Sequence, residues 1–280
     1  MDSDFVPTGW TRRSLRDLLE PGGLFDGPFG SNLKTSDYTD RGVRVIRLEN
    51  IGNLRFIGGK ETYISEEKYS GLTKHTVAEE DIIVGSFVDG AVRVCILPQL
   101  ATKAIAKADC FCVRPRRDIV DRRFIAFQLG TDQSRDALLE NIHGATRPRI
   151  TTKQLRGMEI LVAPLAEQRR IVAMIQDLLG RVNAVRERLA RLPILGLGEG
   201  VETRLAGAAP RVDKISRAIL AKAFRGELVP TEAELARDEG RDYETAEALL
   251  ARIGHDSKSR IRDKKSIKRS TNGKRRKSTR

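Results

Sequence analysis

The longest regular pattern of apolar and polar positions lies between Pro164 and Leu192. Apolar residues recur there at alternating steps of four and three, namely Ile171, Ile175, Leu178, Val182, Val185, Leu189 and Leu192. Such a repeat is typical of a helix whose narrow apolar seam packs against another helix, as in a coiled coil. A helix of about 27 residues is about 40 Å long. We therefore expect a long helix that needs a helical neighbour.

A second helical pattern begins at Pro210 and ends near Gly226. Its apolar side contains Val212, Ile215, Ile219, Leu220 and Phe224. This helix is predicted either to fold back on the first or to pair with a helix of another chain. Residues 231–243 are acidic and are expected to be exposed, and residues 243–253 predict one last amphipathic helix.

The chain before Pro164 has a different pattern, with short alternating or β-branched stretches that are typical of strands. These stretches are residues 43–48, 81–84, 91–96, 110–113 and 158–162. Helical spacing appears at 124–129 and 137–142, and a short helix over Leu15, Leu18 and Leu19 is expected to end at Pro21-Gly22-Gly23. No regular strand–helix–strand repeat is present, so the pattern predicts a mixed α/β (α+β) domain.

These patterns divide the chain into four predicted parts. They are a mixed domain over 1–163, a helical spacer or dimerisation region over 164–230, an amphipathic helix over 231–256 and a tail over 257–280. The tail holds 12 Lys and Arg against Asp263, a charge of +11, so only +2 of the net charge of +13 remains for the rest. Such a tail is too polar to fold by itself, and it either neutralises DNA phosphates or is simply solvated.

The composition restricts where the protein is expected to act. No long apolar run and no signal peptide are evident, so we expect no membrane partner. Cysteines are few, at Cys95, Cys110 and Cys112. Their odd number is typical of the reducing cytoplasm, and their alternation with Phe111 and Val113 favours buried thiols over metal ligands.

Motifs that carry chemistry are not evident in this sequence. The glycine patterns of nucleotide-binding loops, dinucleotide folds and serine hydrolases do not occur, and the three histidines lack metal-ligand spacing. Glu66-x-Lys68 fits half of a nuclease signature, but its polar surroundings favour a solvated surface. The residues thus predict neither a catalytic site nor a metal site.

Binding is the remaining function that the residue pattern favours. Loops that combine Arg and Lys with Asn, Ser and Thr are suited to contacts with DNA phosphates and base edges. We predict that the loop around Ser31 and the loop around Arg147 line one DNA-facing cleft, although the first is equally compatible with an ordinary connection. The candidate DNA-binding residues are Ser31, Asn32, Lys34, Arg44, Arg47, Thr146, Arg147, Arg149 and Lys153.

Several motifs, in their order and spacing, resemble the specificity subunits of type I restriction-modification systems. They are the lead-in to Trp10, residues 26–34, 45–52 and 144–150, the segment 164–171, and the C-terminal segments 219–228 and 244–253. The resemblance implies a target recognition domain that recognises a DNA half-site, followed by helices that set the half-site spacing. It also implies a chain without catalysis of its own.

The same resemblance implies partners and cofactors. A methyltransferase subunit is expected to use S-adenosylmethionine, and a separate restriction subunit is expected to use ATP and Mg, so this chain itself binds no cofactor. The usual subunit carries two recognition domains, whereas this chain has room for one. It is expected to pair with a second copy, to complement a separately encoded half, or to be a degenerate fragment. A symmetric homodimer predicts an inverted-repeat, gapped target.

Two other classes of function stay open on the sequence alone. One is a self-contained nuclease or DNA methyltransferase, which requires a metal or methyl-donor site. The other is a coiled-coil protein that associates with DNA without sequence preference. Competition by random DNA separates sequence recognition from the second class, and incubation of the chain alone with DNA, magnesium and S-adenosylmethionine tests the first.

Overall fold

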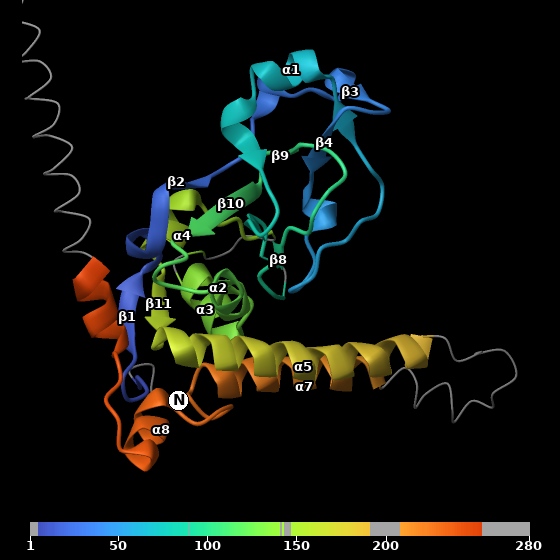
Figure 1. The fold of residues 1–280 in the computed structure, drawn as a ribbon. Coiled ribbons are helices and arrows are strands. Elements are labelled where there is room, and N and C mark those ends of the chain that lie inside the picture. The colour runs from blue at the N-terminus through green and yellow to red at the C-terminus, as the bar shows by residue number, and fades with distance from the viewer. Residues whose placement is uncertain (1–4, 89, 141, 143–146, 191–207, 254–280) are drawn as a thin grey trace, which may run out of the picture.

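The computed structural model describes residues 5–88, 90–140, 142, 147–190 and 208–253. An α/β body, residues 5–163, stands on a pair of long helices (Figure 1). The two ends of the body meet in one small sheet, in which β1 (Thr11–Ser14) pairs antiparallel with β11 (Glu159–Val162). Because Thr11 lies opposite Val162, the chain enters the body beside the point where it leaves for the first long helix.

A four-stranded antiparallel sheet forms the middle of the body, in the order β2-β10-β7-β8. The strands are β2 (Leu19–Phe25), β10 (Cys110–Pro115), β7 (Ile82–Gly85) and β8 (Val94–Ile96). The prediction that Pro21-Gly22-Gly23 ends a helix is wrong, because these residues lie within β2, after the 3-10 helix η1 (Leu15–Leu18). Proline is tolerated there because β2 is an edge strand.

A five-stranded sheet forms the end of the body far from the long helices (Figure 1). Its order is β3-β5-β4-β9-β6, and only β4 and β9 run parallel. The strands are β3 (Tyr38–Thr39), β5 (Tyr63–Ile64), β4 (Val43–Ile46), β9 (Ala104–Ala106) and β6 (Thr76–Val77). The mixed α/β class predicted from the sequence is therefore observed.

Short helices connect and cover these sheets. They are η2 (Gly30–Asn32), η3 (Thr35–Asp37), η4 (Leu48–Asn50), α1 (Glu66–Ser70), η5 (Thr73–His75), α2 (Arg122–Leu129), α3 (Asp132–Leu139) and α4 (Thr152–Gly157). The predicted helix at 124–129 corresponds to α2. The one predicted at 137–142 overlaps α3 only at residues 137–139, since α3 begins earlier and Ile142 is not helical. Cys95, Cys110 and Cys112 are buried as free thiols, and burial raises the pKa of Cys95 to about 12.

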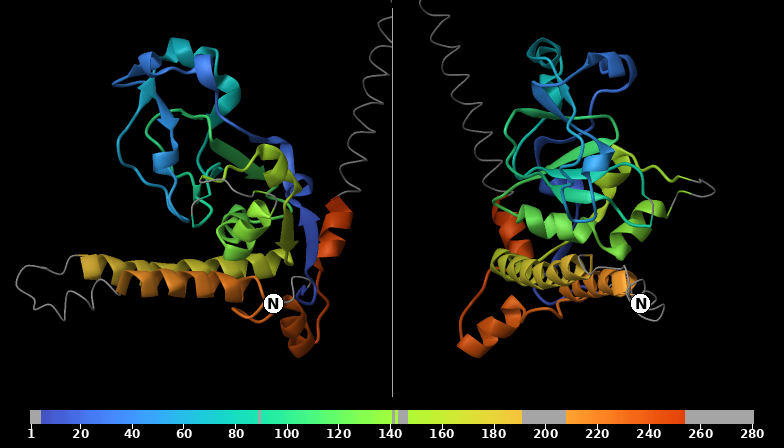
Figure 2. Two further views of the ribbon diagram at one scale, coloured as in Figure 1. Left: turned by 180° about the vertical axis from the view of Figure 1, so that it is seen from behind. Right: turned by 90° about the vertical axis from the view of Figure 1, so that its right-hand side faces the viewer.

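The long helices α5 (Leu165–Ala190) and α7 (Ala208–Ala223) lie side by side below the body (Figures 1 and 2). They run antiparallel, since Arg186 pairs with Asp213 near one end and Arg170 donates to the Pro230 carbonyl at the other. Near the body the predicted seam is buried at Ile171 and Ile175. It is partly buried at Leu178 and Val182.

The predicted helix interface needs correction at two positions. Val185 and Ile215 are each 50% exposed, although Ile219 is partly buried and Phe224 is buried. Two helices cover only one side of each other. On α7 the buried positions include Val212 and Leu220, which the pattern predicted on the apolar side, and Ala223. Of the remaining seam residues, Leu189 lies in the last turn of α5 and Leu192 lies outside the described residues.

The acidic segment that follows α7 contains a short helix whose start is buried. Residues Glu232–Glu239 form α8, which begins with a capping box between Thr231 and Glu234. Glu232 is buried and pairs with Arg170 and Arg241, each at 2.7 Å. The predicted exposure is confirmed for Glu234 and for residues 237–242, whereas Thr231, Glu232 and Ala236 are buried. The two arginines compensate the buried charge of Glu232. Residues 246–253 form the last described helix.

A buried carboxylate joins the entry of the body, α5 and α8. Glu167 accepts hydrogen bonds from Trp10 Nε1 at 2.8 Å and from the Glu232 backbone N–H at 2.8 Å. The next residue, Gln168, accepts from the Asp121 N–H at 2.8 Å and donates to the Ala163 carbonyl at 2.8 Å. One core of buried residues therefore runs from the body through α5 to α7 and the last described helix.

Among the helices that the structure describes, none has both the length and the apolar character needed to cross a bilayer.

Candidate nucleic-acid interface

The turn-rich loop of residues 26–34 is fixed to the body at its start. Asp26 Oδ1 accepts from the N–H groups of Gly27 at 2.7 Å and of Asp109 at 2.9 Å. A Cβ at Gly27 would lie 2.1 Å from the backbone carbonyl carbon of Lys107, so only glycine fits there. The loop thus has a rigid base, which the sequence showed only as a cluster of turn-forming residues.

Burial of Asp26 has an electrostatic cost. Desolvation raises the pKa of Asp26 to about 6, even though its two backbone hydrogen bonds lower the pKa. The negative charge of Asp109 also acts to raise this pKa, and the positive charge of Arg149 acts to lower it. These three charged groups therefore lie close enough to influence one another.

Residues 147–150 are joined to the segment that follows β7. Phe87 and Arg149 form a β-bridge, the Val88 N–H donates to the Pro148 carbonyl at 3.0 Å, and the Ile150 N–H donates to the Ser86 carbonyl at 2.8 Å. These bonds hold the backbone of the second predicted DNA-binding loop on the central sheet. A loop on a rigid scaffold is a suitable place for binding residues.

The side chain of Arg149 is held between several groups. Its Nη2 lies 2.5 Å from Asp109 Oδ1, and the same carboxylate oxygen accepts from Ser86 Oγ at 2.8 Å. The guanidinium lies 5.8 Å from the ring centroid of Phe29 and 5.9 Å from that of Phe87, within cation–π range. The Arg149 side chain is still 47% exposed, so part of its guanidinium can donate to a ligand.

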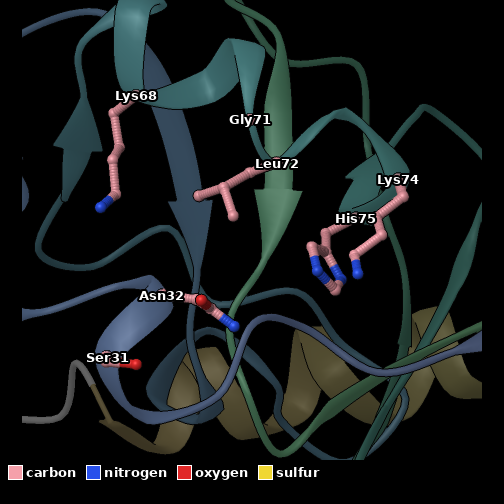
Figure 3. Close-up of a pocket in the computed structure, with 7 residues that line it drawn as sticks. All are labelled: Ser31, Asn32, Lys68, Gly71, Leu72, Lys74 and His75. Carbon is pink, nitrogen blue, oxygen red and sulfur yellow. The ribbon is translucent and has the colours of Figure 1, made fainter.

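A surface hollow of about 310 Å³ lies beside the first loop. Figure 3 shows Ser31 and Asn32 of this loop facing Lys68 of α1 and the pair Lys74 and His75 of η5. Two lysines, an amide and a hydroxyl around one hollow are suited to an anionic ligand such as a phosphate.

Hydrogen bonding defines the tautomer of His75. Its Nδ1 lies 2.7 Å from the backbone carbonyl of Asp26, which only accepts, so Nδ1 carries a proton. Partial burial lowers the pKa of His75. The ring is therefore mainly neutral at neutral pH, and its Nε2 is an acceptor. The donors toward an anion are the two lysines, Asn32 and the Ser31 hydroxyl.

The structure brings the two predicted loops together through Phe29 and Arg149. Ser31 and Asn32 line the hollow, whereas Arg147 and Arg149 do not. Arg147, Lys34 and Lys153 are exposed. Arg47 is partly exposed, pairs with Glu49 at 3.5 Å and lies 5.9 Å from the Tyr38 ring. Thr146 lies outside the described residues.

Arg44 contradicts its prediction as a DNA-binding residue. Its side chain is only 5% exposed, its Nη1 pairs with Glu61 at 2.6 Å and its Nη2 donates to the Gly58 carbonyl at 3.0 Å. Strand β4 directs it inward against the Tyr63 ring, 5.6 Å away. The sequence shows an arginine between β-branched residues, and only the fold shows that both faces of this strand are covered.

Several residues of these two surfaces were not predicted from the sequence. They are Phe29, Lys68, Lys74, His75, Phe87 and Asp109. Asp109 has a positive φ of 71°, which is uncommon outside glycine. For residues 26–34 the sequence showed a cluster of turn formers, with no signal for Phe29 itself. Among the described residues, no three His, Cys, Asp or Glu side chains converge to hold a metal ion.

Comparison with known proteins gives a consistent result. Residues 7–192 match the family described as type I restriction modification DNA specificity domain. The EcoBI specificity subunit of Escherichia coli is 28% identical over 167 residues, covering 59% of this chain and 32% of that protein. The StySPI specificity subunit of Salmonella potsdam is 25% identical over 222 residues, covering 75% of this chain and 43% of that protein.

A solved structure of a type I R-M system, concerned with complex assembly and conformational transition, contains a chain of similar fold. That chain has a TM-score of 0.50 and 19% identity, and the match covers 81% of this chain and 48% of that one. This likeness concerns the fold alone. The matches span less than half of the length of these curated relatives.

Proposed function

Since this chain belongs to the type I restriction modification DNA specificity family, we propose that it is a DNA-recognising subunit without catalysis of its own. Its α/β body recognises a half-site of double-stranded DNA. A methyltransferase subunit and a restriction subunit, which bind S-adenosylmethionine, ATP and Mg, carry out the chemistry. This division of labour needs no cofactor on the present chain.

The observation that carries the proposal is the setting of Arg149. An arginine that is held by a carboxylate loses less rotamer freedom when it meets a base than a free surface arginine does. Asp109 holds the guanidinium by its ion pair, the Phe29 and Phe87 rings lie within cation–π range of it, and the Arg149 side chain stays 47% exposed. A guanidinium donates to O6 and N7 of guanine in the major groove, which is the commonest specific contact to DNA.

The hollow beside the first loop supports contact with the DNA backbone. Lys68 and Lys74 provide positive charge, and Asn32 and Ser31 provide hydrogen-bonding groups. Lys68 also pairs with Asp37 at 3.1 Å, so its charge is partly compensated. Phosphate contacts of this kind position a protein without selecting a sequence.

The long helices serve, in this proposal, as the coiled-coil spacer that sets the distance to a second half-site. That half-site is recognised by a second copy or by a separate specificity half. The exposed apolar side chains Met174, Val185 and Ile215 on α5 and α7 are suited to such a partner or to the methyltransferase. Val185→Glu with Ile215→Glu is expected to reduce co-purification of the methyltransferase, and unchanged co-purification would place that interface elsewhere.

Mapping of methylated sites tests the proposed function directly. Cells that express this chain with the methyltransferase of its system should carry adenine methylation at one defined motif, and cells without the chain should not. Arg149→Ala should relax one position of the motif, since a bidentate base contact contributes about 1–3 kcal/mol of discrimination. Arg44→Ala is the control, because Arg44 is buried. The methylated motif should stay unchanged in the fraction of this variant that folds. Methylation without a motif, or with the same motif in Arg149→Ala, contradicts the proposal.

A further inference from the structure

We infer that Phe29 determines specificity by contacting the methyl group of a thymine next to the base that Arg149 contacts. This inference rests on the proposed function and gives Phe29 a role beyond its cation–π contact with Arg149. Phe29 is 51% exposed, among the most exposed of the large apolar side chains that the structure describes.

The exposure of Phe29 is enforced by its loop. Gly27 packs against the backbone of Lys107 too closely for any side chain, and Pro28 behind it is buried. The Asn32 N–H donates to the Phe29 carbonyl at 3.1 Å, which begins η2. The backbone therefore holds the ring at the surface, although burial of an aromatic side chain is favourable.

The position of the ring relative to Arg149 limits what it can contact. The guanidinium lies 5.8 Å from the Phe29 centroid. Successive bases of a DNA strand are about 3.4 Å apart along the axis. A ligand base that meets the guanidinium therefore has its neighbour within reach of Phe29.

The apolar character of the Phe29 ring determines which neighbouring base it contacts favourably. Among the base edges of the major groove, only thymine presents an apolar group, its C5 methyl, and phenylalanine is one of the side chains that contact it. Insertion of the ring between stacked bases is the other use of phenylalanine on DNA. Insertion needs a ring that is free on both faces, whereas here Arg149 lies against one face and the rigid loop keeps the ring in place.

Selection of binding sites from random duplex DNA provides the test. The full chain, assembled with the methyltransferase of its system, is compared with Phe29→Ala, Phe29→Leu and Arg149→Ala. Wild type should select a thymine beside the position that Arg149→Ala loses. Phe29→Ala should lose the thymine preference. It should keep the base preference that depends on Arg149, because the contacts of Arg149 with Asp109 and Phe87 remain. Phe29→Leu, which is still apolar, should retain part of the thymine preference.

A substitution in the DNA isolates the methyl group. Deoxyuridine in place of that thymine should weaken wild-type binding about fourfold, the effect of burying one methyl group, and should leave Phe29→Ala binding unchanged. Ile57→Ala removes another exposed apolar side chain of the body and serves as the matched control. Circular dichroism checks that each variant is folded.

The outcomes separate this inference from its premise. Equal binding of thymine and deoxyuridine sites by wild type overturns the role of Phe29. A Phe29→Ala variant that keeps the thymine preference also overturns this role. The role is likewise overturned if Phe29→Ala weakens binding equally for all sequences, which is the result expected of a ring inserted between bases. If wild type selects no motif at all, the proposed function itself fails.

Discussion

Replacement of Glu167 by alanine should destabilise the junction between the body and the long helices. The variant leaves the Trp10 indole N–H and the Glu232 backbone N–H buried without an acceptor, where wild type has two bonds of 2.8 Å. A hydrogen bond to a charged acceptor contributes about 1.5–3 kcal/mol, so the two bonds together contribute roughly 3–6 kcal/mol. Burial raises the pKa of Glu167, which offsets part of this gain. We expect a net loss of about 3 kcal/mol.

The single tryptophan of the chain makes this loss measurable at the junction. Trp10 is buried beside Phe124, and its fluorescence follows urea unfolding of the region that Glu167 joins. A loss of 3 kcal/mol corresponds to a fall in Tm of about 6–12 °C for a chain of this size. Glu167→Gln keeps one acceptor oxygen and should lose only about 1–2 kcal/mol.

Two comparisons control the measurement. Asp177→Ala breaks an exposed ion pair with Arg181 on the same helix and should cost less than about 0.5 kcal/mol. Trp10→Phe, followed by circular dichroism, should show a coupling of about 1 kcal/mol or more with Glu167→Ala, because both remove the same bond. If Glu167→Ala stays within about 1 kcal/mol of wild type, the buried bonds do not hold the junction.

Further predictions concern the first loop and the tail. Gly27→Ala should lower the free energy of unfolding by about 2 kcal/mol or more and weaken site choice, because its Cβ would lie 2.1 Å from the Lys107 backbone. Gly58→Ala, with open space around its Cβ, is the control. Equal Tm values for the two variants contradict the packing argument. The raised pKa of Asp26, about 6 against 3.8, stabilises the fold fully below the lower value and is lost as pH rises through the upper one. Relative to Asp26→Asn, wild type should therefore lose up to about 2 kcal/mol between about pH 4.5 and about pH 7 in urea unfolding, and a constant difference refutes the assignment. Deletion of residues 257–280, with their charge of +11, should lower the salt dependence of DNA binding and leave the selected motif unchanged, and a changed motif contradicts this.

The predicted DNA-binding residues show which part of a site prediction depends on composition and which part depends on the fold. Loops with Arg, Asn and Ser were identified by composition, and two of them do meet at Arg149. Arg44 was included because it is an arginine in the same stretch, yet it is buried against Glu61. Conversely, Phe29 and Lys74 were missed because a single aromatic or lysine in a loop carries no local signal of what lies beside it.

The amino-acid sequence by itself determined the long helix, the second helix, the main strands and the separation of charge between tail and body. These features depend on the periodicity and composition of neighbouring residues, which local backbone preferences convert directly into structure. Tertiary structure alone decided that Pro21 lies in an edge strand, that Glu232 is buried between two arginines, and that Asp109 orients Arg149 beside Phe29. Each of these contacts joins residues far apart in the chain, and their burial and pairing depend on how the sheets and helices pack together.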